Sequence, residues 1–135
     1  MSTRIARPDT AFSDNVHSKN AKPVRARTYM DWIKTLPCMI THVYGVDPAH
    51  VNTPNLKYGH TGRGKADKSS DRWCLPLHRL QHRDQEKRGE ETFWKVNNIN
   101  QYEACLSLWG AYQERGTAAH DWAVRMILND EWKLK

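Results

Sequence analysis

The sequence predicts an α+β fold, in which a short two-stranded hairpin is followed by several helices. Two short apolar runs, 38–46 and 73–77, flank an irregular stretch with three glycines. A polar segment free of glycine and proline follows at 78–88. Two further segments, 101–114 and 118–128, space their apolar residues as amphipathic helices do. Strand-like runs that precede a series of helical patterns are typical of the α+β class.

The composition indicates one domain with a basic surface. The chain has 135 residues, which suffices for one modest core. Lys and Arg total 21 and Asp and Glu total 15, for a net charge of +6. Such a charge suits binding to a polyanion, because Lys and Arg contacts to phosphate supply most non-specific affinity for nucleic acid. It is equally typical of a soluble protein with a solvated basic face.

The first 28 residues are predicted to be a basic arm, disordered until it meets a partner. Apolar residues are sparse there and follow no period. An arm without any role is the alternative, and residues 29–135 would form the folded domain. The arm carries six basic side chains and two acidic ones: Arg4, Arg7, Lys19, Lys22, Arg25 and Arg27 against Asp9 and Asp14.

The cysteines and the hydropathy point to a protein inside a cell. The three cysteines, Cys38, Cys74 and Cys105, form no CxxC pair, so we expect buried thiols and neither a disulfide framework nor a zinc ribbon. No apolar run has the length of a membrane span, and Met1–Pro8 lacks the apolar core of a signal peptide. A cytoplasmic location is therefore expected, without a membrane partner.

The first half of the chain should supply the hairpin. Residues 29–36 are apolar enough for a short helix or an entering strand, which Pro37 ends. The β-branched residues of 38–46 predict the first strand, and Asp47-Pro48 predicts a turn after it. Residues 52–71 form an irregular loop of the kind that is functional or mobile. The second strand is expected at 73–77, with Pro76 at an edge or an end.

The second half of the chain should be helical. The polar segment 78–88 predicts an exposed helix, with Gly89 as its C-cap. Further helices are expected at 90–96, 101–114 and 118–128. Most of the six tryptophans stand in these patterned segments, so we expect them to pack in the core rather than to stack on bases.

A possible metal site follows from spacing on the polar helix. His78 and His82 are four residues apart, as are His82 and Glu86. Residues at i and i+4 share one face of a helix, so each pair offers two ligands to one cation. Imidazole and carboxylate together suit a divalent metal that keeps open positions. Three solvent-facing polar side chains are the alternative, and spacing alone favours it.

The wider context resembles the HNH endonuclease superfamily, especially small phage and prophage members of the RecA-dependent recombination nuclease type. The likeness lies in DPAHV at 47–51 and in GRGKADKSSDRWCLPLHRLQHRDQEKRGEETFW at 62–94, and it covers about residues 37–110. The matching positions are Gly62, Gly64, Lys65, Asp67, Trp73, Pro76, Leu77, His82, Gly89, Glu90, Phe93 and Trp94. The resemblance implies a ββα-metal (HNH-like) motif with additional helices.

The resemblance also implies an activity: metal-dependent hydrolysis of phosphodiester bonds in DNA by a phage or mobile-element protein in a bacterium or infected cell. His50 matches the general base, a task that suits an imidazole. His82 matches a metal ligand on the helix, and Glu86 stands where many members carry a second one. A divalent ion is implied, Mg²⁺ or Mn²⁺ ahead of Zn²⁺ or Ni²⁺, because a carboxylate favours the harder metals. RNA remains an alternative substrate, and any protein partner is left open.

The chain departs from the family pattern at four positions. His78 replaces a cysteine, Gln81 and Glu86 replace histidines, and Ala49 precedes the base where many members have a ligand. His78 is therefore expected either to supply the missing ligand or to cap the helix. Asp71 either orients His50, reaches the metal or serves as a turn residue. The departures leave two rivals: a catalytically decayed module that binds nucleic acid or a protein, as an inhibitor does, and a structural protein of a mobile element.

Basic residues around the proposed centre would hold the nucleic-acid backbone. The segment 59–65 lacks the GxxxxGK[ST] pattern and a preceding apolar strand, so it does not indicate nucleotide hydrolysis. Its amides and basic side chains could still contact DNA phosphates. The alternative is a hinge loop. The residues predicted to contact nucleic acid are Lys57, Arg63, Lys65, Lys68, Arg79 and Arg83.

Overall fold

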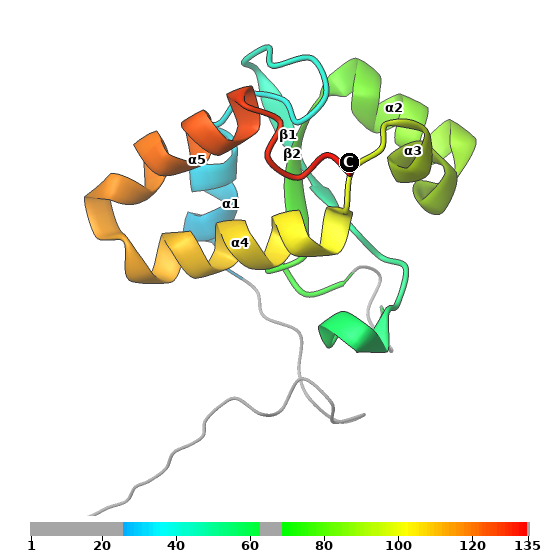
Figure 1. Cartoon of the computed structure of the whole chain (residues 1–135), viewed down its shortest axis with the longest axis horizontal. Coiled ribbons are helices and arrows are strands. Elements are labelled where there is room, and N and C mark those ends of the chain that lie inside the picture. Colours follow the sequence, from blue (N-terminus) through cyan, green and yellow to red (C-terminus); the bar gives the residue numbers. More distant parts are fainter. Residues whose placement is uncertain (1–25, 63–68, 135) are drawn as a thin grey trace, which may run out of the picture.

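The computed structural model describes residues 26–62 and 69–134 and shows an α+β fold with one antiparallel pair of strands (Figure 1). The predicted fold class is therefore confirmed at this level. The elements are α1 (Arg27–Ile33), β1 (Val46–His50), β2 (Cys74–His78), α2 (Arg79–Arg88), α3 (Glu90–Val96), α4 (Gln101–Glu114) and α5 (Ala119–Leu128), with 3-10 turns at Leu56–Tyr58 and Gly116–Ala118. The arm residues 1–25 lie outside the described ranges, and α1 begins at Arg27, inside the predicted arm.

Strand β1 lies later in the chain than predicted. It spans Val46–His50 and pairs antiparallel with β2, with Pro48 opposite Pro76 and His50 opposite Cys74. The predicted turn at Asp47-Pro48 is thus part of the strand, which corrects the prediction. Proline has no N–H to donate, so two facing prolines fit where an antiparallel ladder needs no hydrogen bond between the paired residues.

The residues predicted as the first strand, 38–46, form a closed loop up to Gly45. The Cys38 N–H donates to the carbonyl of Val43 over 2.9 Å, and the His42 N–H donates back to the carbonyl of Cys38 over 3.0 Å. His42 has a φ of 64°, in the left-handed region where a strand cannot continue. The β-branched residues of this stretch therefore misled the prediction, because local hydrogen bonds use the groups that a ladder would need.

The helices agree closely with the predictions. α3 and α4 have the predicted bounds, and α2 begins at Arg79 because His78 serves as its N-cap. The Nδ1 atom of His78 accepts the N–H of Leu80 over 3.3 Å. Gly89 is the C-cap of α2 and the N-cap of α3, so the two short helices meet at this residue. Its φ of 91° is a backbone conformation that favours glycine.

The core lies between the strands and the helices α1, α3, α4 and α5. Leu75 and Leu77 of β2 are fully buried, as are Phe93 and Trp94 of α3. Tyr29 of α1 packs edge-on against Trp109 of α4, with ring centroids 4.8 Å apart. The three cysteines are free and buried, as predicted.

Three of the tryptophans, Trp73, Trp94 and Trp132, are buried. The other three, Trp32, Trp109 and Trp122, pack against the core in partly buried positions. The expected packing of the tryptophans in or against the core is therefore confirmed. No helix in the described part of the chain has both the length and the apolar character needed to cross a bilayer.

Candidate functional site

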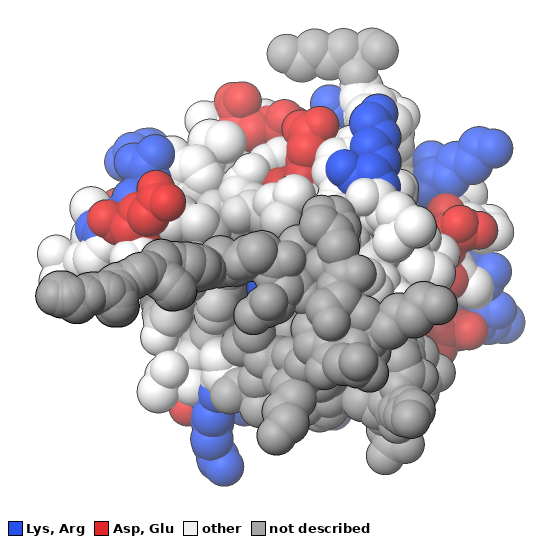
Figure 2. Space-filling model, turned by 90° about the horizontal axis from the view of Figure 1, so that it is seen from below, with Lys and Arg blue, Asp and Glu red and all other residues white. Residues whose placement is uncertain are grey.

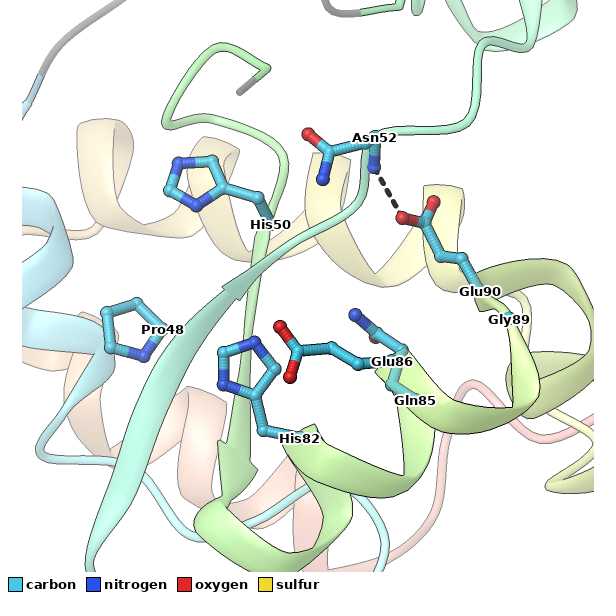
Figure 3. Close-up of a pocket in the computed structure, with 8 residues that line it drawn as sticks. All are labelled: Pro48, His50, Asn52, His82, Gln85, Glu86, Gly89 and Glu90. Atoms are coloured by element: carbon cyan, nitrogen blue, oxygen red, sulfur yellow. Dashed lines mark hydrogen bonds between the residues drawn. The ribbon is translucent and has the colours of Figure 1, made fainter. Parts of the chain in front are cut away.

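A pocket of about 320 Å³ opens between the end of β1 and the helix pair α2–α3 (Figure 3). β1 contributes its last residues, α2 contributes one face, and α3 contributes its first residue. Antiparallel pairing runs β2 back along β1, and α2 starts directly after β2, so the fold turns α2 toward β1. The pocket is lined by Pro48, His50, Asn52, His82, Gln85, Glu86, Gly89 and Glu90.

Three side chains that the sequence singled out share this pocket. Figure 3 shows His82 and Glu86, one helical turn apart, lying side by side and pointing from α2 toward β1. The imidazole of His50 lies apart from that pair, at the end of β1. The histidine and the carboxylate on the helix are partly or fully exposed, so a hydrated cation has access to both.

Asp47 adds a carboxylate beside this pair. One of its oxygens lies 4.0 Å from Nδ1 of His82. Asp47 belongs to the DPAHV motif at 47–51, but the resemblance of that motif implies no ligand role for it. A carboxylate and an imidazole are ligands that suit Mg²⁺ or Mn²⁺, but Asp47 lines the neighbouring depression rather than the pocket itself.

His50 is held in place by a buried carboxylate. Nε2 of His50 lies 2.8 Å from Oδ1 of Asp71, and the two side chains are only 9% and 4% exposed. The other oxygen of Asp71 accepts the backbone N–H of Ala26 over 2.7 Å. Since a carboxylate accepts, Nε2 of His50 is the donor in this contact. Of the roles weighed for Asp71, the contact supports orientation of His50.

The thiol of Cys74 completes a close group with this pair. The ligand atoms of His50, Asp71 and Cys74 all lie within 4.8 Å of one another. Pairing of the strands explains the proximity, because Cys74 stands directly opposite His50. Among the described residues, these three side chains come close enough together to hold one metal ion. His82, Glu86 and His50 do not form such a close group among the described residues.

Glu90 fastens the loop after β1 to the start of α3. Its two carboxylate oxygens accept the backbone N–H groups of Asn52 and Thr53, over 2.8 and 2.7 Å. The side chain of Asn52 accepts the N–H of Ser69 over 2.9 Å. In the sequence, Glu90 stands out only as a position of the matching motif, since a contact over 38 residues leaves no local signal. These bonds fix the backbone that follows His50.

Gln85 lines the same pocket as Glu90. It is 5% exposed, and its Oε1 atom has no hydrogen-bond partner among the described residues. An unpaired buried acceptor costs free energy unless a donor reaches it. Because this oxygen is itself buried, it does not face the open part of the pocket.

His78 is not part of this pocket. Besides capping α2, it lines a separate open depression with Gly45, Asp47, Arg79, Leu80 and Arg83. Of the two roles expected for His78, metal ligand or helix cap, the structure therefore shows the cap. The reason is local geometry: the residue before a helix turns its side chain back onto the first free N–H groups.

Among the described residues, the remaining histidines His42, His60 and His120 make structural contacts. His60 is fully buried and stacks on Trp73, with ring centroids 4.5 Å apart. Its Nε2 lies 2.6 Å from the carbonyl oxygen of Val51, and its Nδ1 accepts the N–H of Gly62 over 2.9 Å. Desolvation by burial lowers the pKa of His60 below its ordinary value. The neutral imidazole therefore links Val51 to Gly62 through hydrogen bonds.

Of the residues predicted to contact nucleic acid, the structure describes Lys57, Arg79 and Arg83, and all three are exposed. Arg79 and Arg83 lie on α2 beside the depression that contains His78. Arg63, Lys65 and Lys68 fall outside the described residues. On the face shown in Figure 2, Lys and Arg side chains are interspersed with Asp and Glu rather than gathered in one patch.

Comparison with known proteins identifies a family. The family model described as "Protein of unknown function (DUF968)" matches residues 14–108, which is more than two thirds of the chain. The matched range contains every residue of the pocket and also Asp71 and Cys74. Neither the curated proteins nor the solved structures contain a significant match.

Proposed function

We propose that this chain, which belongs to the DUF968 family, is a metal-dependent endonuclease that hydrolyses phosphodiester bonds in DNA. The observation that carries the proposal is one pocket lined by a histidine at the end of β1 and by His82 and Glu86 on the helix that follows β2. This order of elements and side chains is what a ββα-metal centre requires. The resemblance of 47–51 and 62–94 to HNH endonucleases supports the same conclusion.

His82 and Glu86 would hold the divalent cation, and a carboxylate oxygen of Asp47 lies 4.0 Å from Nδ1 of His82. Their donor set, imidazole and carboxylate, accepts Mg²⁺ or Mn²⁺ and leaves positions open. When bound, the cation would polarise the scissile phosphate and stabilise the negative charge of the leaving oxygen. Gln85 would form part of the wall beside this pair.

His50 would act as the general base. Asp71 holds the proton of the neutral imidazole on Nε2, so the lone pair that takes a proton from water is on Nδ1. Asp71 also fixes the ring in one orientation, and Glu90 fixes the backbone that follows His50. In this proposal Asp71 and Glu90 are positioning residues, and His50 is the catalytic residue.

Arg79, Arg83 and Lys57 would hold the DNA backbone. Arg79 and Arg83 extend from the same helix as His82 and Glu86, so a strand held by them passes beside the proposed metal ligands. Contacts of this kind position the duplex and carry no sequence information. We therefore expect cleavage with little sequence preference.

Nicking of supercoiled plasmid by the purified full chain tests the proposal. With Mn²⁺ or Mg²⁺ we expect relaxed and linear products, and none with a chelator. His50→Ala should reduce the rate by on the order of 10²–10⁴, the usual contribution of a general base. His120→Ala is the matched control, because His120 is partly exposed and lies outside the pocket. Among the described residues, its Nε2 contacts the carbonyl oxygen of Thr35 and its Nδ1 lies 3.7 Å from the carboxylate of Asp121. Equal rates for wild type and His50→Ala would refute the assignment.

A binding module without catalysis is the second candidate. It is favoured by the separation of His50 from the His82–Glu86 pair and by Glu86 and Gln81 at positions where relatives of the HNH type carry histidine. This candidate predicts that the chain binds DNA but never cuts it with Mg²⁺, Mn²⁺, Ni²⁺ or Zn²⁺. The same plasmid assay, run beside a binding titration, separates the two functions.

A further inference from the structure

The group formed by His50, Asp71 and Cys74 is chemically different from the pair on α2. It combines an imidazole, a carboxylate and a thiol, and all three ligand atoms lie within 4.8 Å of one another. Asp71 and Cys74 are buried, and the side chain of His50 is only 9% exposed. Nothing in the proposed mechanism uses the thiol.

The geometry of the group is close to that of a zinc site. Zinc binds sulfur at about 2.3 Å and nitrogen or oxygen at about 2.0–2.2 Å, so two ligand atoms around a tetrahedral ion lie about 3.3–3.7 Å apart. Because the three ligand atoms already lie within 4.8 Å of one another, an adjustment of the side chains by about 1 Å brings them around one ion. The antiparallel register already holds Cys74 opposite His50.

The carboxylate is also supported as metal ligands usually are. The second oxygen of Asp71 accepts the N–H of Ala26 over 2.7 Å, which orients the carboxylate and leaves Oδ1 directed at His50. Outer contacts of this kind fix ligands in metal sites. Three protein ligands and one open position are typical of zinc, and the thiolate selects a soft metal over Mg²⁺.

We propose that His50, Asp71 and Cys74 bind Zn²⁺ or a similar thiophilic cation at a site separate from His82 and Glu86. On binding, the Cys74 thiol releases its proton and the thiolate forms the metal–sulfur bond. The metal takes the place of the proton on Nε2 of His50, and the neutral imidazole then carries its proton on Nδ1. The charge and the protons balance with the release of one proton from the thiol.

This binding would inhibit the nuclease, a consequence that rests on the proposed function. A neutral imidazole has one lone pair, and the metal at Nε2 uses it. Nδ1 is then protonated and cannot take a proton from water. Zinc in the site therefore removes the general base while His82 and Glu86 remain able to hold Mg²⁺ or Mn²⁺.

Titration of the full-length, reduced protein with Co²⁺ tests the site without any cleavage assay. Cobalt substitutes for zinc, and a thiolate ligand produces a charge-transfer band in the near ultraviolet. We expect the band in the wild type, in Cys38→Ser, and in the double variant Cys38→Ala with Cys105→Ala, which keeps Cys74 as its only thiol. We expect its loss in Cys74→Ser, with circular dichroism to verify the fold.

Absence of the band in the wild type, or its absence in the variant that keeps only Cys74, would overturn the proposal. So would a band that persists in a folded Cys74→Ser protein. In a second assay, Zn²⁺ should inhibit Mn²⁺-dependent nicking by the wild type at least 10-fold more strongly than nicking by Cys74→Ser. If the chain binds Co²⁺ through Cys74 but cuts no DNA, the metal site stands and the nuclease assignment fails.

Discussion

At the scale of single residues, Asp71 joins three segments that are far apart in the chain. Its carboxylate contacts His50 of β1 and the N–H of Ala26 at the start of the described chain, and Cys74 lies beside it. The contact with His50 decides which nitrogen of the imidazole carries the proton. The proposed role of His50 as a base thus depends on a residue 21 positions away.

Replacing Asp71 with asparagine should slow cleavage without unfolding the protein. The amide of Asp71→Asn can donate to Nε2, which places the imidazole proton on Nδ1 and removes the lone pair that the base needs. We expect a decrease in kcat on the order of 10–100-fold, with KM for DNA nearly unchanged. Asp121→Asn, at an exposed acidic residue of α5, is the control. An unchanged kcat in Asp71→Asn would contradict the positioning role.

His60 makes the stability of the domain depend on pH. Burial lowers its pKa in the folded state below the ordinary value of 6.5. The unfolded chain therefore takes up a proton first as the pH falls, and the folded state loses stability below about pH 6.5. Above that pH both states carry a neutral imidazole, and the contribution is constant.

Urea unfolding at pH 7.5 and pH 5.5 measures this effect. The free energy of unfolding should fall between the two values, and the fall should be smaller in His60→Gln, whose amide stays neutral while it can bond to Val51 and Gly62. The same pH dependence in wild type and His60→Gln would show that other groups cause it.

The proposed site was only partly predictable from single residues. The i, i+4 spacing and the family resemblance selected His50, His82 and Glu86, and all three line one pocket. Asp71 and Glu90 act through contacts that span 21 and 38 residues. Orientation of His50 was one of three roles that the sequence left open for Asp71, and the structure was needed to choose among them. No local pattern records which backbone a carboxylate reaches after folding, so the contacts of Glu90 also needed the structure.

At the scale of elements, the helices were easier to predict than the strands. Helices α3 and α4 have the predicted bounds because their apolar spacing and their caps are local features. The first strand was misplaced, because pairing with β2 decides where β1 lies. Pro48 indicated a turn when considered alone, yet opposite Pro76 it fits the ladder.

The connection between β1 and α3 depends on Glu90. Two charge-assisted hydrogen bonds join its carboxylate to the N–H groups of Asn52 and Thr53. Glu90→Ala should therefore lower the free energy of unfolding by about 2 kcal/mol. Glu91→Ala is a matched control in the same helical turn, because Glu91 is exposed. Chemical denaturation measures the free energy of unfolding of both variants. Equal decreases would show that the hydrogen bonds of Glu90 do not stabilise this connection.

At the scale of the whole molecule, charge is distributed unevenly along the sequence. The net charge is +6, and residues 1–25 contain five basic and two acidic side chains. The described domain mixes both signs on the face in Figure 2. We therefore expect the first 25 residues to supply much of the non-specific attraction to DNA.

Replacing Arg4, Arg7, Lys19, Lys22 and Arg25 with glutamine tests this expectation. The slope of log K against log salt should decrease by about 0.9 for each phosphate contact that is lost. Arg125→Gln with Lys133→Gln, which changes exposed residues of α5 and the C-terminal segment, should leave the slope nearly unchanged. If neutralising the arm leaves the slope the same, the arm does not contact DNA.

The central claim is that the pocket between β1 and α2 holds a divalent cation beside His50. The most direct measurement is a crystal structure of the full chain grown with Mn²⁺, with data collected to locate manganese by anomalous scattering. We predict a peak in the pocket within bonding distance of His82 and Glu86, on the side that faces His50. A structure whose pocket is intact but shows no manganese at those two side chains would contradict the account.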